Sequence, residues 1–302
     1  MKAQLIDGKR ISAEIKAEAA EEAAALKAKG ITPCLAVVLV GDDSASQVYV
    51  NNKKKACEAV GIRSVSHVLS GGTTEEALLE LIAKLNADKD IHGILVQMPV
   101  PKQIDERKVI LAIDPKKDVD CFHPVNVGNL HTGGEGFLPC TPAGIIELIK
   151  RSGHSIEGKQ CVVIGRSNIV GKPVAMLLMQ ENGTVTICHS KTRNLAEICR
   201  GADIIVSAVG KVNTVTADMV KEGAILIDVG MNRNEAGKLC GDVDFENVKE
   251  IAGAITPVPG GVGPMTIAML MKNCNTAAAT ATTVSSARPP PASCATRPTT
   301  TA

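Results

Sequence analysis

Short apolar runs alternate with helical segments along the first part of the chain. Strands are predicted from the apolar runs at 35–40, 64–69 and 93–99. Helices are predicted from periodic, Ala/Glu/Lys-rich or well-capped segments at 10–29, 44–59, 74–86 and 103–113. This alternation is typical of a mostly parallel sheet with helices on both faces.

Residues 114–136 interrupt the alternation with turn residues, and a second alternating block follows a predicted helix at 141–152. Its predicted strands are 161–164, 184–188, 203–208 and 224–228, and its helices are expected to begin near Pro173, Asn194 and Thr216. The pattern therefore predicts two α/β domains, 1–121 and 122–275, with the boundary placed between 120 and 145.

The last part of the sequence has a different composition. From Asn275 onward the residues are mainly Ala, Thr, Ser and Pro. Such a segment buries too little apolar surface to offset the entropy that ordering would cost. We therefore expect residues 276–302 to form a disordered, low-complexity tail without function.

Composition narrows the possible functions. The 302 residues are 45% hydrophobic and 22% charged with a net charge of +1, so neither nucleic acid nor membrane is an expected partner. No apolar run reaches the roughly 20 residues of a membrane span, and the N-terminus lacks the apolar core of a signal peptide. The ten cysteines include no C-x-x-C pair, so we expect no metal and a reducing, cytoplasmic location.

Tyr49 and Lys53 are four residues apart in the predicted helix at 44–59, so they share one face near its start. A tyrosine ring can stack on a flat substrate while keeping a polar tip. A lysine can carry protons if partial burial favours its neutral form. On this segment alone, a solvated lysine-rich helix face is the simpler interpretation.

A nucleotide site is predicted where the strand 161–164 runs through a polar loop into a helix, because free N–H groups there suit a phosphate. The loop carries only Gly165 and Gly171, so it matches neither G-x-G-x-x-G nor a Walker loop, and an ordinary strand–helix turn is an open alternative. The next strand ends without a carboxylate. Ser190 there, together with Arg166, favours NADP over NAD, with a plain capped turn as the alternative.

Six motifs, taken in order, resemble the bifunctional methylenetetrahydrofolate dehydrogenase/cyclohydrolase family. They are Tyr49-x-x-x-Lys53, Val96-Gln97-Met98-Pro99, Lys117-Asp118-Val119-Asp120, Pro139-Cys140-Thr141-Pro142, Gly165-Arg166-Ser167-x-x-Val170-Gly171-x-Pro173 and TPVPGGVGP at 256–264. The resemblance implies two α/β domains facing across a cleft, the second Rossmann-like, with a tetrahydrofolate derivative on the first and NADP on the second, in a homodimer. It also implies oxidation of 5,10-methylene-tetrahydrofolate to the methenyl form and hydrolysis to 10-formyl-tetrahydrofolate, which supplies formyl groups for purine synthesis.

The resemblance also assigns roles to residues. Lys53, Gln97, Asp120 and Tyr49 would form the catalytic group: Lys53 takes a proton from water, Gln97 holds Lys53, Tyr49 stacks on the folate and Asp120 accepts hydrogen bonds from the pterin. Further substrate contacts are implied for Val96, Met98, Pro259, Gly260, Gly261, Val262 and Gly263. NADP contacts are implied for Gly165, Arg166, Ser167, Ser190 and Met231.

Two positions depart from the family pattern. The family usually has glycine where this chain has Cys121; if that residue needs a positive φ, cysteine strains the Asp120 loop and weakens substrate binding. The last helix is expected over 264–273, packing on the first domain. In the family this helix continues further, whereas here the Ala/Thr/Pro tail follows, so we expect the helix to be loosely docked.

Other functions are open at this point. Short-chain dehydrogenases also use Tyr-x-x-x-Lys, but their glycine loop comes before that pair, whereas Tyr49 precedes Gly165 here. A folate- or nucleotide-binding protein without turnover is a second alternative, and the presence of Lys53, Gln97 and Asp120 together argues against it. A dehydrogenase without the hydrolase step is a third.

Overall fold

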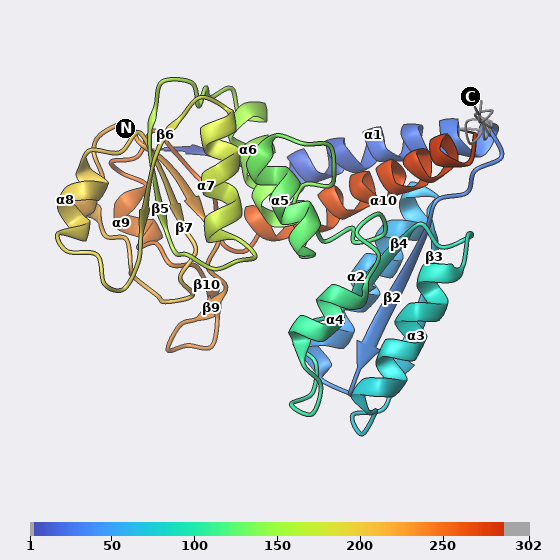
Figure 1. Ribbon diagram of the computed structural model, residues 1–302. Helices are drawn as coiled ribbons and strands as arrows, with labels where there is room; N and C mark the ends of the chain where they lie inside the picture. The colour runs from blue at the N-terminus through green and yellow to red at the C-terminus, as the bar shows by residue number, and fades with distance from the viewer. Residues whose placement is uncertain (1–2, 287–302) are drawn as a thin grey trace, which may run out of the picture.

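A three-stranded parallel sheet forms one part of the computed structural model, which describes residues 3–286 (Figure 1). In the order β3-β2-β4, its strands are β3 (Arg63–Leu69), β2 (Cys34–Val40) and β4 (Gly93–Val96), and its helices are α2 (Ser44–Val60), α3 (Glu75–Ala87) and α4 (Glu106–Ala112). All of β2 is buried because its alternating side chains meet helices on both faces. Val38 packs in one cluster with Leu78 of α3 and Val109 of α4, and Val37 packs in another with Val50 of α2.

A six-stranded sheet forms the other part, and all its neighbouring strands are parallel. In spatial order its strands are β1 (Gln4–Leu5), β11 (Ala254–Ile255), β8 (Ile225–Asp228), β7 (Ile204–Ser207), β5 (Gln160–Ile164) and β6 (Thr184–Cys188). The chain leaves β5 for β6 on one side and then crosses to β7 on the other. Ligands of open α/β sheets bind outside the carboxyl ends of the strands at such a reversal.

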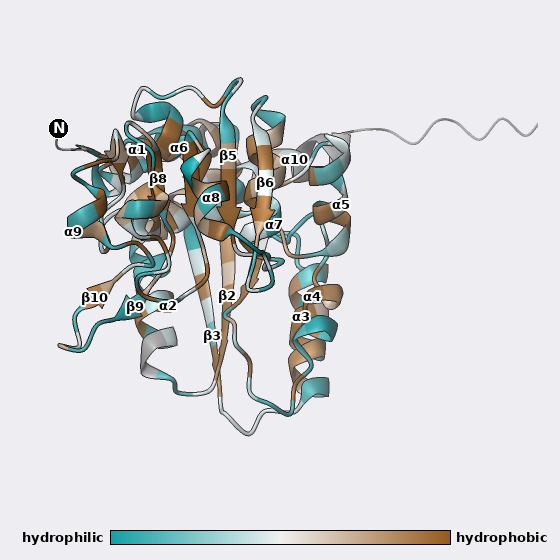
Figure 2. Cartoon of the chain, turned by 90° about the vertical axis from the view of Figure 1, so that its left-hand side faces the viewer, coloured by the Kyte–Doolittle hydropathy of each residue, from teal (hydrophilic) through white to brown (hydrophobic). Residues whose placement is uncertain are grey.

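Helices cover both faces of this second sheet. One face packs on α6 (Cys140–Arg151) and α7 (Gly171–Gln180), with α5 (Pro124–Thr132) beside α7; the other packs on α8 (Leu195–Arg200), the 3₁₀ turn η1 (Ala217–Met219) and α9 (Phe245–Val248). A short antiparallel hairpin, β9 (Asn232–Arg233) and β10 (Leu239–Cys240), projects from the sheet. In Figure 2 the inner strands β2 and β5 are mostly hydrophobic, whereas the edge strand β3 is partly hydrophilic.

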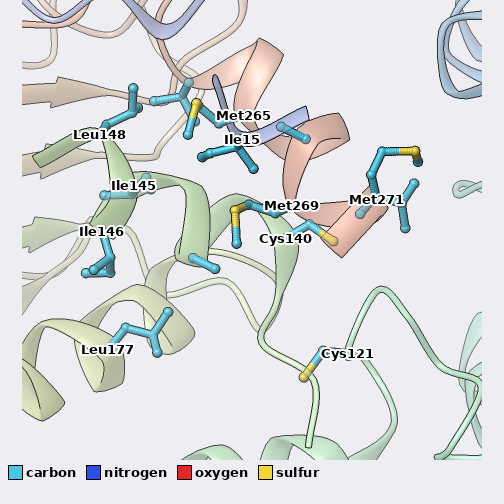
Figure 3. Close-up of a cluster of buried hydrophobic side chains, with 14 of the residues drawn as sticks. Ile15, Cys121, Cys140, Ile145, Ile146, Leu148, Leu177, Met265, Met269 and Met271 are labelled. Atoms are coloured by element: carbon cyan, nitrogen blue, oxygen red, sulfur yellow. The ribbon is translucent and has the colours of Figure 1, made fainter. Parts of the chain in front are cut away.

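Two long helices, α1 (Gly8–Ala28) and α10 (Val262–Ser286), lie side by side and connect the two sheets (Figure 1). Figure 3 shows apolar side chains of α1, α6 and α10 meeting around Ile15, Ile145 and Met265. A Cβ at Gly144 would lie 2.7 Å from the Cβ of Met265, so glycine is what allows α6 and α10 to approach this closely.

The end of the chain corrects one expectation. Residues 276–286, expected to be disordered, continue α10, and residues 287–302 lie outside the described part of the chain. The helix is also firmly docked rather than loose: Ala277 and Ala278 are buried, and Asn275 Nδ2 donates to Ala19 O at 2.8 Å. Small residues of low sequence hydrophobicity become core residues here because α1 offers a preformed surface to pack against.

The N-terminal residues join the sheet of the other half. β1 pairs with β11, so the polypeptide starts in the second sheet before it builds the first. Residues 3–7 and 122–261 therefore contribute to the six-stranded part and its helices, while α1 and α10 belong to the connection between both parts. Among the described residues, no helix is long and apolar enough to cross a membrane.

Candidate active site

Lys53 and Gln97 are bonded to each other. Lys53 lies on α2, and 9% of its surface is exposed. Its Nζ donates to Oε1 of Gln97 at 3.0 Å. Gln97 follows directly after β4, and its own Nε2 donates to the carbonyl of Met98 at 2.8 Å, so its amide oxygen is turned to the lysine. The structure thus brings together two residues that are 44 positions apart in the sequence.

Tyr49 reaches the other half of the molecule. It lies one turn before Lys53 on α2 and is 41% exposed. Its hydroxyl donates to Sδ of Met231 at 3.3 Å, and Met231 lies between β8 and β9. Two predicted site residues from the two different parts of the molecule, Tyr49 and Met231, are therefore in direct contact.

The two acids of the Lys117–Asp120 motif have different surroundings. Asp118 is buried and accepts hydrogen bonds from His123 N at 2.8 Å and Asn126 Nδ2 at 2.9 Å, so it fixes the loop. Asp120 is less occupied: among the described residues, its carboxylate has one side-chain hydrogen-bond donor, the Cys140 thiol at 4.0 Å. Burial raises the pKa of Asp120, while the positive charge of nearby Lys53 acts in the opposite direction.

Cys121 adopts the positive φ that is unfavourable for a residue other than glycine. Its φ is +62°, in the left-handed region that favours glycine. The side chain is buried and its Sγ donates to Phe137 O at 3.0 Å. Burial raises the pKa of this thiol to about 12, so it stays protonated and unreactive. The expected backbone strain beside Asp120 is therefore present.

A narrow cavity lies next to Asp120. Its lining includes two of the expected substrate contacts, Val96 and Met98, and also Phe122. Phe122 lies two residues after Asp120, and Ile110 and Ile113 complete the lining from the α4 side. The cavity measures only about 10 Å³, far less than a heterocycle occupies, so these residues are apolar packing behind the carboxylate rather than a ligand pocket.

The glycine-rich loop at 259–263 lies against the start of α1. Gly260 has a φ of +108°, and a Cβ on Gly261 would lie 2.6 Å from the carbonyl oxygen of Pro257. A Cβ on Gly8 would lie 1.8 Å from the carbonyl oxygen of Gly261, so helix and loop are in backbone contact. Val262 is buried at the start of α10, whereas Pro259 and Gly263 are exposed. Within residues 3–286, no hydrogen bond joins this loop to Lys53, Gln97 or Asp120.

The loop between β5 and α7 is shaped by two glycines. A Cβ on Gly165 would lie 2.4 Å from Ala208 O, and one on Gly171 would lie 2.3 Å from Gly165 O. Ser167 Oγ accepts from the backbone N–H groups of Val170 and Gly171, each at 3.2 Å. Arg166 is exposed beside this turn. A tight backbone turn with a helix N-terminus and a free cation fits a dinucleotide phosphate.

Ser190 lies on the neighbouring loop. β5 and β6 are parallel partners, so the loops after Ile164 and Cys188 emerge at the same edge of the sheet. Ser190 is exposed there, whereas Thr192 accepts a hydrogen bond from His189 N at 2.8 Å and closes its own turn. The capped-turn interpretation thus describes Thr192 and leaves Ser190 available. No group of three or more metal-ligating side chains occurs in the described residues.

Two family models match the chain. Residues 6–120 match the model described as tetrahydrofolate dehydrogenase/cyclohydrolase, catalytic domain, and residues 139–282 match the one described as tetrahydrofolate dehydrogenase/cyclohydrolase, NAD(P)-binding domain. The chain belongs to the tetrahydrofolate dehydrogenase/cyclohydrolase family. The resemblance inferred from six motifs is thereby confirmed.

Other members of this family are similar over nearly the whole chain. The bifunctional protein FolD of Agathobacter rectalis is 62% identical over 272 residues, which are 90% of this chain and 98% of that protein. The crystal structure of Campylobacter jejuni FolD is 53% identical with a TM-score of 0.90, covering 92% of this chain and 99% of that one. The Trypanosoma brucei enzyme, solved with NADP cofactor and an inhibitor, is 41% identical with a TM-score of 0.88, covering 93% and 99%. These structures confirm the two-domain α/β fold with a Rossmann-like second part.

Proposed function

We infer that this protein oxidises 5,10-methylene-tetrahydrofolate to the 5,10-methenyl form with NADP and then hydrolyses the product to 10-formyl-tetrahydrofolate. The observation that carries this inference is the buried Lys53–Gln97 pair beside Asp120, in a chain whose relatives are bifunctional dehydrogenase/cyclohydrolases. Its product would supply formyl groups for purine synthesis.

In the first step the protein positions two flat molecules against each other. NADP, when bound, accepts the hydride from the methylene carbon. We assign its phosphates to Gly165, Arg166, Ser167 and Ser190, and its nicotinamide side to the neighbourhood of Met231. The Tyr49–Met231 contact supports this assignment because it marks where the folate side meets the cofactor side. Holding both reactants there lowers the entropic part of the barrier.

In the second step water attacks the cationic methenyl carbon and its proton passes to Lys53 Nζ. The hydroxyl proton of the resulting carbinolamine passes to N5 as the bond from that carbon to N5 breaks, which leaves N5–H and a formyl group on N10. In its neutral form Lys53 accepts the proton of the attacking water, as a general base must. Gln97 Oε1 orients Nζ, since a lysine held by one acceptor keeps its lone pair in a fixed direction.

The remaining contacts hold the folate. Tyr49 would stack on the rings of the folate, and Asp120 would accept hydrogen bonds from N–H groups of the pterin. These hydrogen bonds would favour the ionised carboxylate, whereas burial raises the pKa of Asp120. Val96 and Met98, at the carboxyl end of β4, would contact the substrate beside Asp120. The 259–263 loop, from Pro259 to Gly263 and including Gly260, Gly261 and Val262, would approach the ligand with its backbone.

We also propose that the protein is a homodimer in the cytoplasm. β3 is the edge strand of its sheet, and Val68 on it is 66% exposed, which leaves a seven-residue edge for a second copy. The nine cysteines of the described part of the chain are all free, which fits a reducing compartment. Sedimentation velocity tests the dimer, and a monomer at micromolar concentration would contradict it.

A dual assay tests the function. Methylene-tetrahydrofolate is supplied with NADP or NAD, and reduced nicotinamide and methenyl product are followed separately. We expect reduced NADP to accumulate faster than methenyl-tetrahydrofolate, because the same protein hydrolyses the methenyl product. We also expect NAD to be a poorer cofactor than NADP. Equal accumulation, after correction for spontaneous hydrolysis, would mean a dehydrogenase alone. No turnover with either cofactor would favour a binding protein.

A further inference from the structure

Asp242 is the most heavily bonded side chain at the carboxyl edge of the six-stranded sheet. It is fully buried, just after β10. Its Oδ2 accepts from Ser207 Oγ at 3.2 Å and from the backbone N–H groups of Val209 and Gly210 at 2.8 and 3.2 Å. Its Oδ1 accepts from Lys211 N and Asn232 Nδ2, both at 2.9 Å. These five donors take up all of the roughly four acceptor sites of a carboxylate, with three of them sharing Oδ2.

These donors come from two different loops. Residues 207–211 run from the last residue of β7 into the loop after it, and Asn232, the first residue of β9, is the neighbour of Met231. The first loop also lies directly behind the proposed phosphate loop, because a Cβ on Gly165 would overlap Ala208 O. The second carries the sulfur that accepts from Tyr49. One carboxylate thus connects both ends of the region assigned to NADP.

A second buried acid fixes Asp242 itself. Asp228 accepts from Gly230 N, Asp242 N and Val243 N, each at 2.9 Å. A Cβ on Gly230 would lie 2.2 Å from Asp242 Oδ1, and a Cβ on Gly241 would lie 1.9 Å from Asp228 Oδ2. The backbone is therefore wrapped tightly around both carboxylates, and burial raises the pKa of Asp228 to about 6.

We propose that Asp242 is a positioning residue for the cofactor: it holds the 207–211 loop and the Met231–Asn232 segment together and so sets the wall against which the nicotinamide end of NADP rests. This inference rests on the proposed function. It assigns Asp242 to the hydride-transfer step alone. Lys53, Gln97 and Asp120 belong to the part built on the three-stranded sheet, and Asp242 bonds to none of them.

The two activities of the protein provide the test. Asp242→Asn turns one acceptor oxygen into a donor that faces N–H groups. We expect the KM for NADP to rise roughly tenfold or more, the size expected for losing a charged hydrogen bond, while hydrolysis of added methenyl-tetrahydrofolate stays within about twofold. Asp244→Asn is the matched control, since Asp244 bonds to Asn247 outside this cluster. NADP binding is also measured by calorimetry.

Each outcome decides. A raised KM with retained hydrolysis supports the positioning role, whereas an unchanged KM, or equal loss of both activities in a folded variant, overturns it. If Asp242→Asn fails to fold, Asn232→Ala replaces it. That change removes only the bonds from Nδ2 to Asp242 Oδ1 and to Gly241 O, and so frees the Met231 segment. The same two results then decide. A wild-type protein that lacks both activities would instead refute the proposed function, and the calorimetric comparison would still report on Asp242.

Discussion

Lys53 and Gln97, in the part built on the three-stranded sheet, are bonded to each other inside the protein. Arg166 and Ser190, on loops of the part built on the six-stranded sheet, are exposed. The folate-side groups sit next to a half-buried acid whose pKa burial has raised. On the cofactor side, Ser167 bonds only to backbone N–H groups of its own turn. The catalytic side chain Lys53 is therefore buried on the folate side, whereas the predicted phosphate-binding side chains Arg166 and Ser190 are exposed to solvent on the cofactor side.

The difference follows from the work that each region would do. A proton-transfer group must be partly desolvated before substrate arrives, because its protonation state depends on burial and neighbouring charges. A phosphate site gains from exposed cations, since burying them in the free protein would cost solvation that only the ligand restores. The comparison therefore predicts that changes on the folate side act on chemistry, and changes on the cofactor side act on binding.

Replacing Lys53 should have the largest effect. Lys53→Met keeps the length and packing of the side chain but removes its nitrogen, and we expect methenyl hydrolysis to fall by roughly 10²- to 10⁴-fold. Folate binding, followed by calorimetry, should remain measurable because Tyr49 and Asp120 are untouched. Lys54→Met, one residue away on the exposed face, is the control. Unchanged hydrolysis in Lys53→Met would remove the role given to this lysine.

Replacing Arg166 should have a smaller effect of a different kind. Arg166→Ala is expected to raise the KM for NADP roughly 10- to 100-fold, as for loss of a charged hydrogen bond. The KM for NAD and the rate of methenyl hydrolysis should hardly change, since neither involves the extra phosphate. Lys159→Ala removes a cation from the opposite end of β5 and serves as the control. An equal loss with both cofactors would mean that Arg166 does not read that phosphate.

The buried strands and helices of both parts could be predicted because their signals are local. The strand predicted at 184–188 has those bounds, and α2 and α7 begin within about two residues of the expected positions. The two-residue strands β1 and β11 could not be found, because their pairing is set by distant segments and two residues show no periodicity. The helical residues 276–286 were missed for the same reason, as their partner is α1.

The candidate site divides in a similar way. Lys53, Gln97 and Tyr49 were predicted from motifs, and the structure adds contacts that the motifs do not contain, such as Tyr49 with Met231. Asp242 gave no signal because its function as an acceptor appears only when loops 207–211 and 230–232 converge on it. Sequence patterns reveal the groups that face a ligand more readily than the groups that hold the surrounding backbone.

Cys121 gives the smallest expected effect and the finest test of how well the folate side is arranged. Because its φ is +62°, glycine should fit this backbone better than any L-residue by about 1 kcal/mol. Cys121→Gly and Cys121→Ala both remove the buried thiol and its bond to Phe137 O, so the difference between the two variants isolates the backbone. We expect the glycine variant to have the higher free energy of unfolding in urea, and a lower KM for methylene-tetrahydrofolate through a relaxed Asp120 loop. Ala143→Gly, in the helical backbone of α6, should show the opposite sign by about 1 kcal/mol. If alanine at 121 proves as stable as glycine, the left-handed residue costs nothing, and the strain inferred from its φ is refuted.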